Sequence, residues 1–217
     1  MRILVISDIH GSRNAVIKSA EIASREKIDL ILVLGDISHN DFEEAISLLE
    51  KLAKIKKVFF IPGNMDSKKL LTWTRDNIVN IHCKVEAINN DQKILGIGGS
   101  SITPFNTSIE FKEEDIAAKL DESSKYLEGK KFIFASHCPP RNTKIDETNF
   151  GMHGGSTSIY KFIAQEKPDM NICGHIHEAF GIDYIGDTII VNTGAVKDSR
   201  YAIIESDQYL TVNLYNF

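Results

Sequence analysis

The sequence is poor in cysteine and in long apolar runs. Its three cysteines, Cys83, Cys138 and Cys173, are an odd and sparse set, which argues against a disulfide framework. No two of them form a Cys-x-x-Cys pair, so a structural zinc site is not expected. No apolar run approaches the roughly 18 residues that span a bilayer, and the first residues lack the pattern of a signal peptide. We therefore expect a cytoplasmic protein that makes no contact with a membrane.

Basic charge is also scarce. The chain has 25 lysines and arginines against 30 aspartates and glutamates, for a formal net charge of −5. Because proteins that bind nucleic acid by neutralising phosphates are usually basic, we expect no stable nucleic-acid partner. A local, metal-rich pocket for one small polyanion stays compatible with this charge. The length of 217 residues and the 42% hydrophobic content suit a single globular domain over residues 1–217.

The first third of the chain alternates apolar, β-branched runs with stretches of helical spacing. In order, it predicts a strand at 2–7, a helix at 13–27, a strand at 30–35, a helix at 42–55, a strand at 57–63 and a short helix at 67–74. Ser12 and the pair Asn40–Asp41 are the expected N-terminal caps of the two longer helices. This alternation is typical of a parallel sheet with crossover helices.

The rest of the chain predicts more strands than helices. Strands are expected at 93–100 and 131–137, with a charged helix around 113–127 between them. Four short β-rich runs near the C-terminus, at 180–186, 188–194, 201–206 and 209–215, indicate antiparallel strands that form a second sheet or extend the first. The segment 138–158 is the longest expected loop, and loops of that length in a compact domain are often functional.

Polar side chains follow five strands, each at its C-terminal end: four of those predicted above and a further one at 170–173, "MNIC". They are Asp8 and His10, Asp36 and His39, Asn64 and Asp66, His137, and finally His175 and His177. Each motif alone also fits a turn or a helix cap, because aspartate and asparagine favour turns. In an open α/β sheet, however, ligands bind outside the carboxyl ends of the strands. Five such ends together favour one common site.

The donor types indicate a metal site. Seven of these residues offer mixed oxygen and nitrogen donors, which suit Mn, Fe, Zn or Ni better than Ca or Mg alone: Asp8, His10, Asp36, Asn64, His137, His175 and His177. Seven ligands are too many for one tetrahedral ion but suit two divalent ions that share a carboxylate. Two ions at about 3.5–4 Å can hold both sides of an in-line displacement at phosphorus.

In chain order, the motifs Asp-x-His, Gly-Asp, Gly-Asn-x-Asp, His and Gly-His-x-His resemble the signature of the calcineurin-like metallophosphoesterases, over nearly the whole chain. More narrowly, "GIGGSSITPFNT", "HCPPRNTKID", "HGGS" and "CGHIHEAFG" are similar to the Icc-related predicted phosphoesterases. The resemblance implies an α/β fold, a four-layer αββα sandwich with two mixed β-sheets flanked by helices.

The resemblance also implies a dinuclear centre, with manganese as the first choice and iron, zinc or nickel as alternatives. One ion would be held by Asp8, His10, Asp36 and His177, and the other by Asp36, Asn64, His137 and His175, so that Asp36 bridges them. A hydroxide bridging both ions would attack phosphorus, since the ions lower its pKa and neutralise the developing charge.

One position departs from the family pattern. Many members have a histidine, thought to protonate the leaving oxygen, where this chain has Met65, and a thioether has no proton to give. Asp66, which would orient that histidine, stays a catalytic candidate without its partner. His39 is the first candidate for the missing acid, and His153 is the second. A hydrogen bond beside the ligands would equally explain His39, and a contact within its loop would explain His153.

These observations predict a metal-dependent phosphoesterase that hydrolyses phosphodiesters or activated esters more readily than simple monoesters. Asn64 and His153 are expected to contact the substrate, a small phosphoester for which nucleotide-derived compounds are one candidate class. The alternative is a non-catalytic interaction module on the same fold, and a DNA-repair type nuclease ranks third because the chain is acidic. Assembly into a homo-oligomer stays open.

Overall fold

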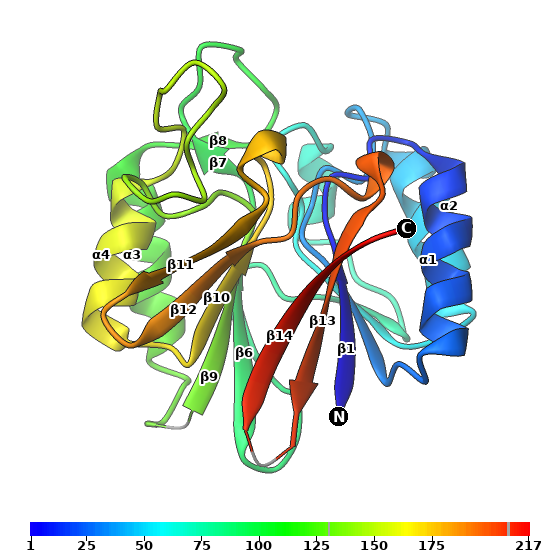
Figure 1. Ribbon diagram of the computed structural model, residues 1–217. Coiled ribbons are helices and arrows are strands. Elements are labelled where there is room, and N and C mark those ends of the chain that lie inside the picture. The colour runs from blue at the N-terminus through cyan, green and yellow to red at the C-terminus, as the bar shows by residue number, and fades with distance from the viewer. Residues whose placement is uncertain (130, 208) are drawn as a thin grey trace.

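Two mixed β-sheets face each other, and a pair of helices covers the outer face of each (Figure 1). The structure is a computed structural model that describes residues 1–129, 131–207 and 209–217. The predicted four-layer αββα sandwich is therefore confirmed.

The first sheet contains the N-terminal strands. Its order is β14 (Leu210–Asn216), β13 (Arg200–Ser206), β1 (Arg2–Ile6), β2 (Leu30–Val33), β3 (Val58–Phe60) and β4 (Ile78–Asn80). Strands β1 to β4 are mutually parallel, whereas β13 is antiparallel to β1 and β14 to β13. The last two strands of the chain therefore extend the sheet that the first residues begin.

The second sheet has the order β11 (Gly181–Ile185), β12 (Thr188–Asn192), β10 (Met170–Cys173), β9 (Lys131–Ser136), β6 (Gln92–Ile97) and β5 (Lys84–Ala87). Only its edge strands, β5 and β11, are antiparallel to their neighbours. The prediction of antiparallel strands near the C-terminus is thus confirmed, since β11 pairs antiparallel to β12 and β13 to β14, although β12 also pairs parallel to β10 on its other side. A further pair, β7 (Ser100–Ser101) and β8 (Glu110–Phe111), stands apart from both sheets.

Four α-helices form the outer layers: α1 (Arg13–Arg25), α2 (Phe42–Ala53), α3 (Glu113–Ser124) and α4 (Thr157–Glu166). Ser12 and Asp41 accept backbone hydrogen bonds as the expected caps of α1 and α2. The short helix predicted at 67–74 is instead a 3₁₀ turn, η1 (Lys68–Leu71), and α4 has no counterpart among the predictions. No helix in the described part of the chain has both the length and the hydropathy to cross a bilayer.

Alternating side chains of the parallel strands fill two different interior layers. In β1, Leu4 and Ile6 pack in the cluster under α1 and α2, whereas Ile3 and Val5 point into the cluster between the two sheets. A third cluster lies between the second sheet and α3 and α4. Because successive side chains of a strand point to opposite faces, a strand buried on both sides has a continuous apolar sequence. Each such run ends abruptly at polar residues, which therefore lie at the rim.

Candidate dinuclear metal centre

The polar strand ends meet between the two sheets. Asp8, Asp36 and Asn64 follow β1, β2 and β3 of the first sheet, whereas His137 and His175 follow β9 and β10 of the second. These ends lie at the upper edge of the sandwich in Figure 1, where η2 (His177–Ala179) also lies. The site is therefore built by both sheets rather than in a crevice of one.

Among the residues that the structure describes, two groups of three side chains have the spacing of metal ligands. The first consists of Asp8, His10 and His177 and the second of Asp36, His137 and His175, and in each group the donor atoms lie within 4.8 Å of one another. The two histidines of "GHIH" thus fall into different groups.

The first group contains a carboxylate oxygen that lacks a hydrogen bond. Asp8 Oδ1 lies 3.2 Å from His177 Nε2 without hydrogen-bond geometry, and His177 Nε2 lies 3.3 Å from His10 Nε2. Asp8 Oδ1 is buried and has no hydrogen-bond partner among the described residues. An unpaired buried carboxylate oxygen is costly. A cation bound between this oxygen and the ring nitrogens of His10 and His177 would remove that cost.

In the second group, neighbouring residues fix the orientation of the donors. His137 Nδ1 lies 2.7 Å from Leu34 O, which places a proton on Nδ1 and the lone pair on Nε2. Asn64 Nδ2 donates to Thr107 Oγ1 at 3.0 Å, which turns Asn64 Oδ1 toward His137 Nε2, 2.8 Å away. Two acceptors then face each other, and a cation between them would remove their repulsion. The residues present therefore fit a metal ion.

Asp36 lies between the two groups. Its Oδ2 is 3.8 Å from His10 Nε2, and its Oδ1 is 3.6 Å from His137 Nε2. The backbone N–H of Met65 donates to Oδ1 at 2.8 Å and fixes the carboxylate. Asp36 can therefore reach both groups, which is the geometry that a bridging ligand needs.

The backbone is strained at these positions. Four of the seven candidate ligands have a positive φ: Asp8 at 56°, His10 at 48°, Asp36 at 47° and His175 at 69°. Such residues cost about 1–3 kcal/mol each and cluster at functional sites. Gly174 allows the turn that carries His175 to approach Asp8, because a Cβ at Gly174 would lie 2.5 Å from Asp8 Oδ2.

Burial and mutual repulsion shift the pKa values. Burial lowers the pKa of His10 to about 4 and that of His175 to about 3, so both imidazoles are neutral and able to ligate a metal. Burial and the charge of Asp8 raise the pKa of Asp36 to about 8. Burial acts to raise the pKa of Asp8 too, but the His177 and His137 imidazoles outweigh it and hold that pKa below its usual value. Divalent ions would relieve the repulsion between Asp8 and Asp36.

Asp66 does not face the two groups as a free carboxylate. It is fully buried and accepts hydrogen bonds from the backbone N–H groups of Gly63, Ile37 and Ser38, at 2.8, 2.9 and 3.0 Å. Burial and the charge of Asp36 nevertheless raise its pKa to about 7. These contacts join the loop of Asp36 to the loop of Asn64.

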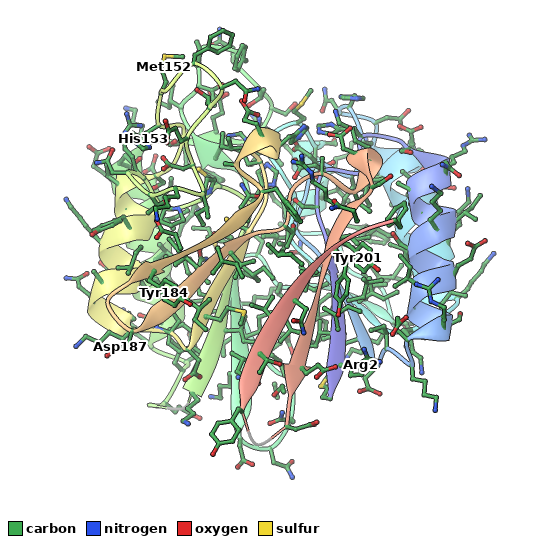
Figure 2. The ribbon with its side chains drawn as sticks, viewed as in Figure 1. Arg2, Met152, His153, Tyr184, Asp187 and Tyr201 are labelled. Atoms are coloured by element: carbon green, nitrogen blue, oxygen red, sulfur yellow. The ribbon has the colours of Figure 1, made fainter. Side chains whose placement is uncertain are left out.

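The two candidate acids lie outside both groups. The ring of His39 is exposed and stacks on His10, with centroids 4.9 Å apart, and the next residue, Asn40, donates its N–H to Met65 O at 2.8 Å. His39 therefore lies beside the position of the missing family histidine. His153 is half-buried in the loop after β9, and its Nδ1 lies 2.8 Å from Asp146 Oδ1 (Figure 2).

Two further residues near the centre are not among the site residues that the sequence predicts. Thr107 orients the Asn64 amide, as described above, from a loop distant in sequence. Lys197, in η3 (Val196–Asp198), lies close enough for its charge to contribute to the low pKa of His10. Its neighbour Val196 donates its N–H to Ser7 O at 2.8 Å, beside Asp8. A positive charge here suits a site for a phosphate group.

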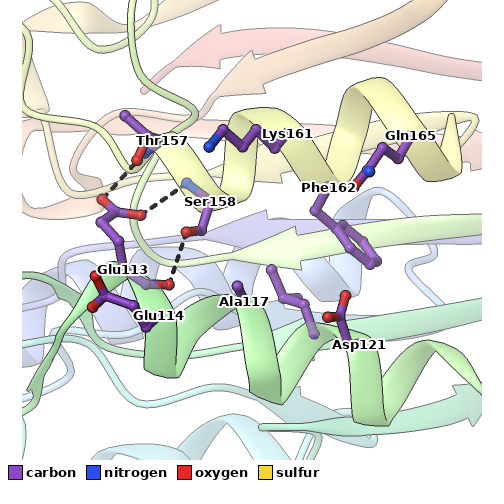
Figure 3. Close-up of a pocket in the computed structure, with 10 residues that line it drawn as sticks. Glu113, Glu114, Ala117, Asp121, Thr157, Ser158, Lys161, Phe162 and Gln165 are labelled. Carbon is purple, nitrogen blue, oxygen red and sulfur yellow. Dashed lines mark hydrogen bonds between the residues drawn. The ribbon is translucent and has the colours of Figure 1, made fainter.

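A separate groove of about 300 Å³ lies between α3 and α4 (Figure 3). At one end, Glu113 accepts hydrogen bonds from Thr157 N and Ser158 N, at the N-terminus of α4. The carboxylate therefore stabilises that helix end. Its described lining residues include none of the candidate ligands, so this groove is not the metal centre.

Comparison with known proteins places the chain in a family. The family model for calcineurin-like phosphoesterases matches residues 1–179, and the chain belongs to this family. It is a phosphoester hydrolase of the metal-dependent class, and its two groups of donors agree with that class.

Individual relatives agree with the fold. The chain is 39% identical to the uncharacterized protein MJ1162 of Methanocaldococcus jannaschii, with 96% of this chain and 97% of that protein covered. TT1561 of Thermus thermophilus is 15% identical with a TM-score of 0.75, and 99% and 98% of the two chains are covered. A structure described as a novel archaeal phosphodiesterase is 15% identical with a TM-score of 0.56, over 99% and 100% of the chains. At these identities, the two structures show a shared fold only.

Proposed function

We propose that this protein hydrolyses small phosphoesters with two divalent ions, the first held by Asp8, His10, Asp36 and His177. Asn64, His137 and His175 hold the second together with Asp36. One observation carries the proposal: two sets of oxygen and nitrogen donors meet on either side of Asp36, and the first contains a buried carboxylate oxygen without a hydrogen bond. When bound, such ions activate water as a nucleophile and neutralise charge on the phosphate.

Phosphodiesters and activated esters are the proposed substrates. Met65 has no proton for a leaving oxygen, so esters whose leaving group needs little protonation should react best. His39, which lies beside Met65, and His153, which Asp146 orients, are the two histidines that we propose can supply a proton. Because both donor groups are complete, the enzyme is favoured over a non-catalytic interaction module on the same fold.

The test is a hydrolysis assay on the purified protein supplied with Mn, Fe, Zn or Ni. Bis(4-nitrophenyl) phosphate, 4-nitrophenyl phosphate and glycerol phosphate represent a diester, an activated monoester and a simple monoester. We expect metal-dependent turnover that is fastest for the diester and slowest for glycerol phosphate. The Asp36→Asn variant should lose this activity, whereas Asp187→Asn, an exposed change in the hairpin between β11 and β12, should keep it (Figure 2). A protein that binds no metal and cleaves none of the three esters would favour the interaction module.

A further inference from the structure

Two loops beyond the metal centre expose large apolar side chains. The first rim loop, residues 102–109, joins β7 to β8 and exposes 64% of Ile102 and 80% of Phe105. The second rim loop, residues 139–156, precedes α4 and exposes 86% of Phe150 and 63% of Met152. Figure 2 shows Met152 at the outer end of its loop, at the top of the molecule. Large apolar side chains that are exposed on the surface are candidates for a binding site.

Both loops are attached to the metal-ligand segments. In the first rim loop, Thr107 Oγ1 accepts from Asn64 Nδ2, and Ile109 N donates to Asn64 O at 2.9 Å. In the second, Asn149 N donates to Glu178 Oε1 at 3.1 Å, and Glu178 directly follows His177. Phe105 is thus two residues from Thr107, which contacts the candidate ligand Asn64. Phe150 directly follows Asn149, whose partner Glu178 is next to the candidate ligand His177.

Local hydrogen bonds fix the exposed side chains on their loops. Phe105 N donates to Thr103 Oγ1 at 3.1 Å, and the hydroxyl groups of Thr103 and Thr107 both donate to Glu110 Oε1 at 2.6 Å. In the second rim loop, Met152 N donates to Thr148 Oγ1 at 3.2 Å. The backbone at Phe105 and at Met152 is therefore held in a defined turn.

We propose that Ile102, Phe105, Phe150 and Met152 bind an apolar organic group of the phosphoester, so that the preferred substrate is an ester of a bulky aromatic or aliphatic alcohol. This inference rests on the proposed phosphoesterase function. The contacts of the two loops with Asn64 and with Glu178 connect both loops to the segments of the proposed metal ligands, which is the reason to assign the organic group of a bound ester to them. Burying the organic group against them supplies binding energy that a small alcohol lacks.

The test compares 4-nitrophenyl decyl phosphate with 4-nitrophenyl methyl phosphate, which share one leaving group, in the Mn-loaded protein. We expect kcat/KM to favour the decyl ester at least tenfold, since burial of a few methylene groups suffices for this ratio. Phe105→Ala and Phe150→Ala should each lower the ratio about tenfold without changing the Mn content. Tyr184→Ala, which removes another exposed ring, from β11, should leave the ratio unchanged.

A ratio near one in the unaltered protein, or an equal loss for both esters in the two variants, would overturn the inference. If neither ester is cleaved, the proposed function fails, and the affinities of decylphosphonate and methylphosphonate, measured by calorimetry, decide the inference alone. A preference for decylphosphonate that Phe105→Ala removes supports it, and equal affinities overturn it. Self-association that both phenylalanine variants abolish would assign the surface to a second copy of the chain and likewise overturn it.

Discussion

Replacement of Asp66 tests how the centre is held together. Its Oδ1 accepts two backbone N–H groups and its Oδ2 accepts a third, from Gly63. In Asp66→Asn, the amide oxygen can keep the first two, but the amide nitrogen then faces Gly63 N as a second donor. One buried N–H loses its acceptor, which costs about 1–3 kcal/mol. Asp66→Ala would leave three N–H groups unpaired at about 3–9 kcal/mol, a large part of the 5–15 kcal/mol typical of a whole domain.

The assay is urea unfolding of the Asp66→Asn variant with and without Mn, together with metal analysis. We expect the free energy of unfolding to fall by about 2 kcal/mol, the middle of that range, and the affinity for Mn to fall with it, because Asp66 joins the loops of Asp36 and Asn64. Asp187→Asn is the matched control and should change neither quantity. Unaltered stability and metal content combined with a large loss of kcat would refute this reasoning and return Asp66 to a direct role in catalysis.

Three further predictions concern the ligands and the acid. In a metal titration, His175→Ala should weaken binding of the ion held by Asp36, His137 and His175. His177→Ala should instead weaken binding of the ion held by Asp8, His10 and His177. An equal loss of both ions from each variant would contradict the assignment. His39→Gln and His153→Gln identify the acid. If the replaced histidine protonates the leaving group, the rate loss should increase with the pKa of the leaving alcohol. A rate loss that is constant across a series of aryl esters would exclude that histidine as the acid. In the metal-free protein, the folded state holds the proton of Asp36 up to about pH 8, whereas the unfolded chain loses it near the ordinary pKa of 3.8. The buried neutral histidines contribute the opposite trend only below their ordinary pKa of 6.5, so stability should fall as the pH rises from about 6.5 to about 8. Thermal unfolding in a chelator measures this trend, and a rise in stability over the same window would contradict it.

Much of the fold could be predicted because strand boundaries are visible in the sequence. The apolar run before Asp8 ends where β1 leaves the core, and the run before Asp36 ends in the same way after β2. A strand buried on both faces has no polar positions until it reaches the rim. The residues at the carboxyl ends of such strands could therefore be assigned to one site from the order of residues alone.

Pairing between distant segments could not be predicted in the same way. The parallel pairing of β12 with β10 depends on contacts across the second sheet, and a local pattern of residues does not show which distant strand will be the neighbour. The role of Asp66 depends on three backbone groups from two loops, and the orientation of Asn64 on Thr107, 43 residues away. A sequence motif names the carboxylate or amide but not the group that it contacts.

The central claim is that two ions lie on either side of Asp36. A crystal structure of the Mn-loaded protein, with anomalous scattering measured at the manganese edge, tests it most directly. We predict two anomalous peaks about 3.5–4 Å apart, one next to Asp8, His10 and His177 and the other next to Asn64, His137 and His175. A single peak at full manganese occupancy, or two peaks that Asp36 does not join, would contradict the account.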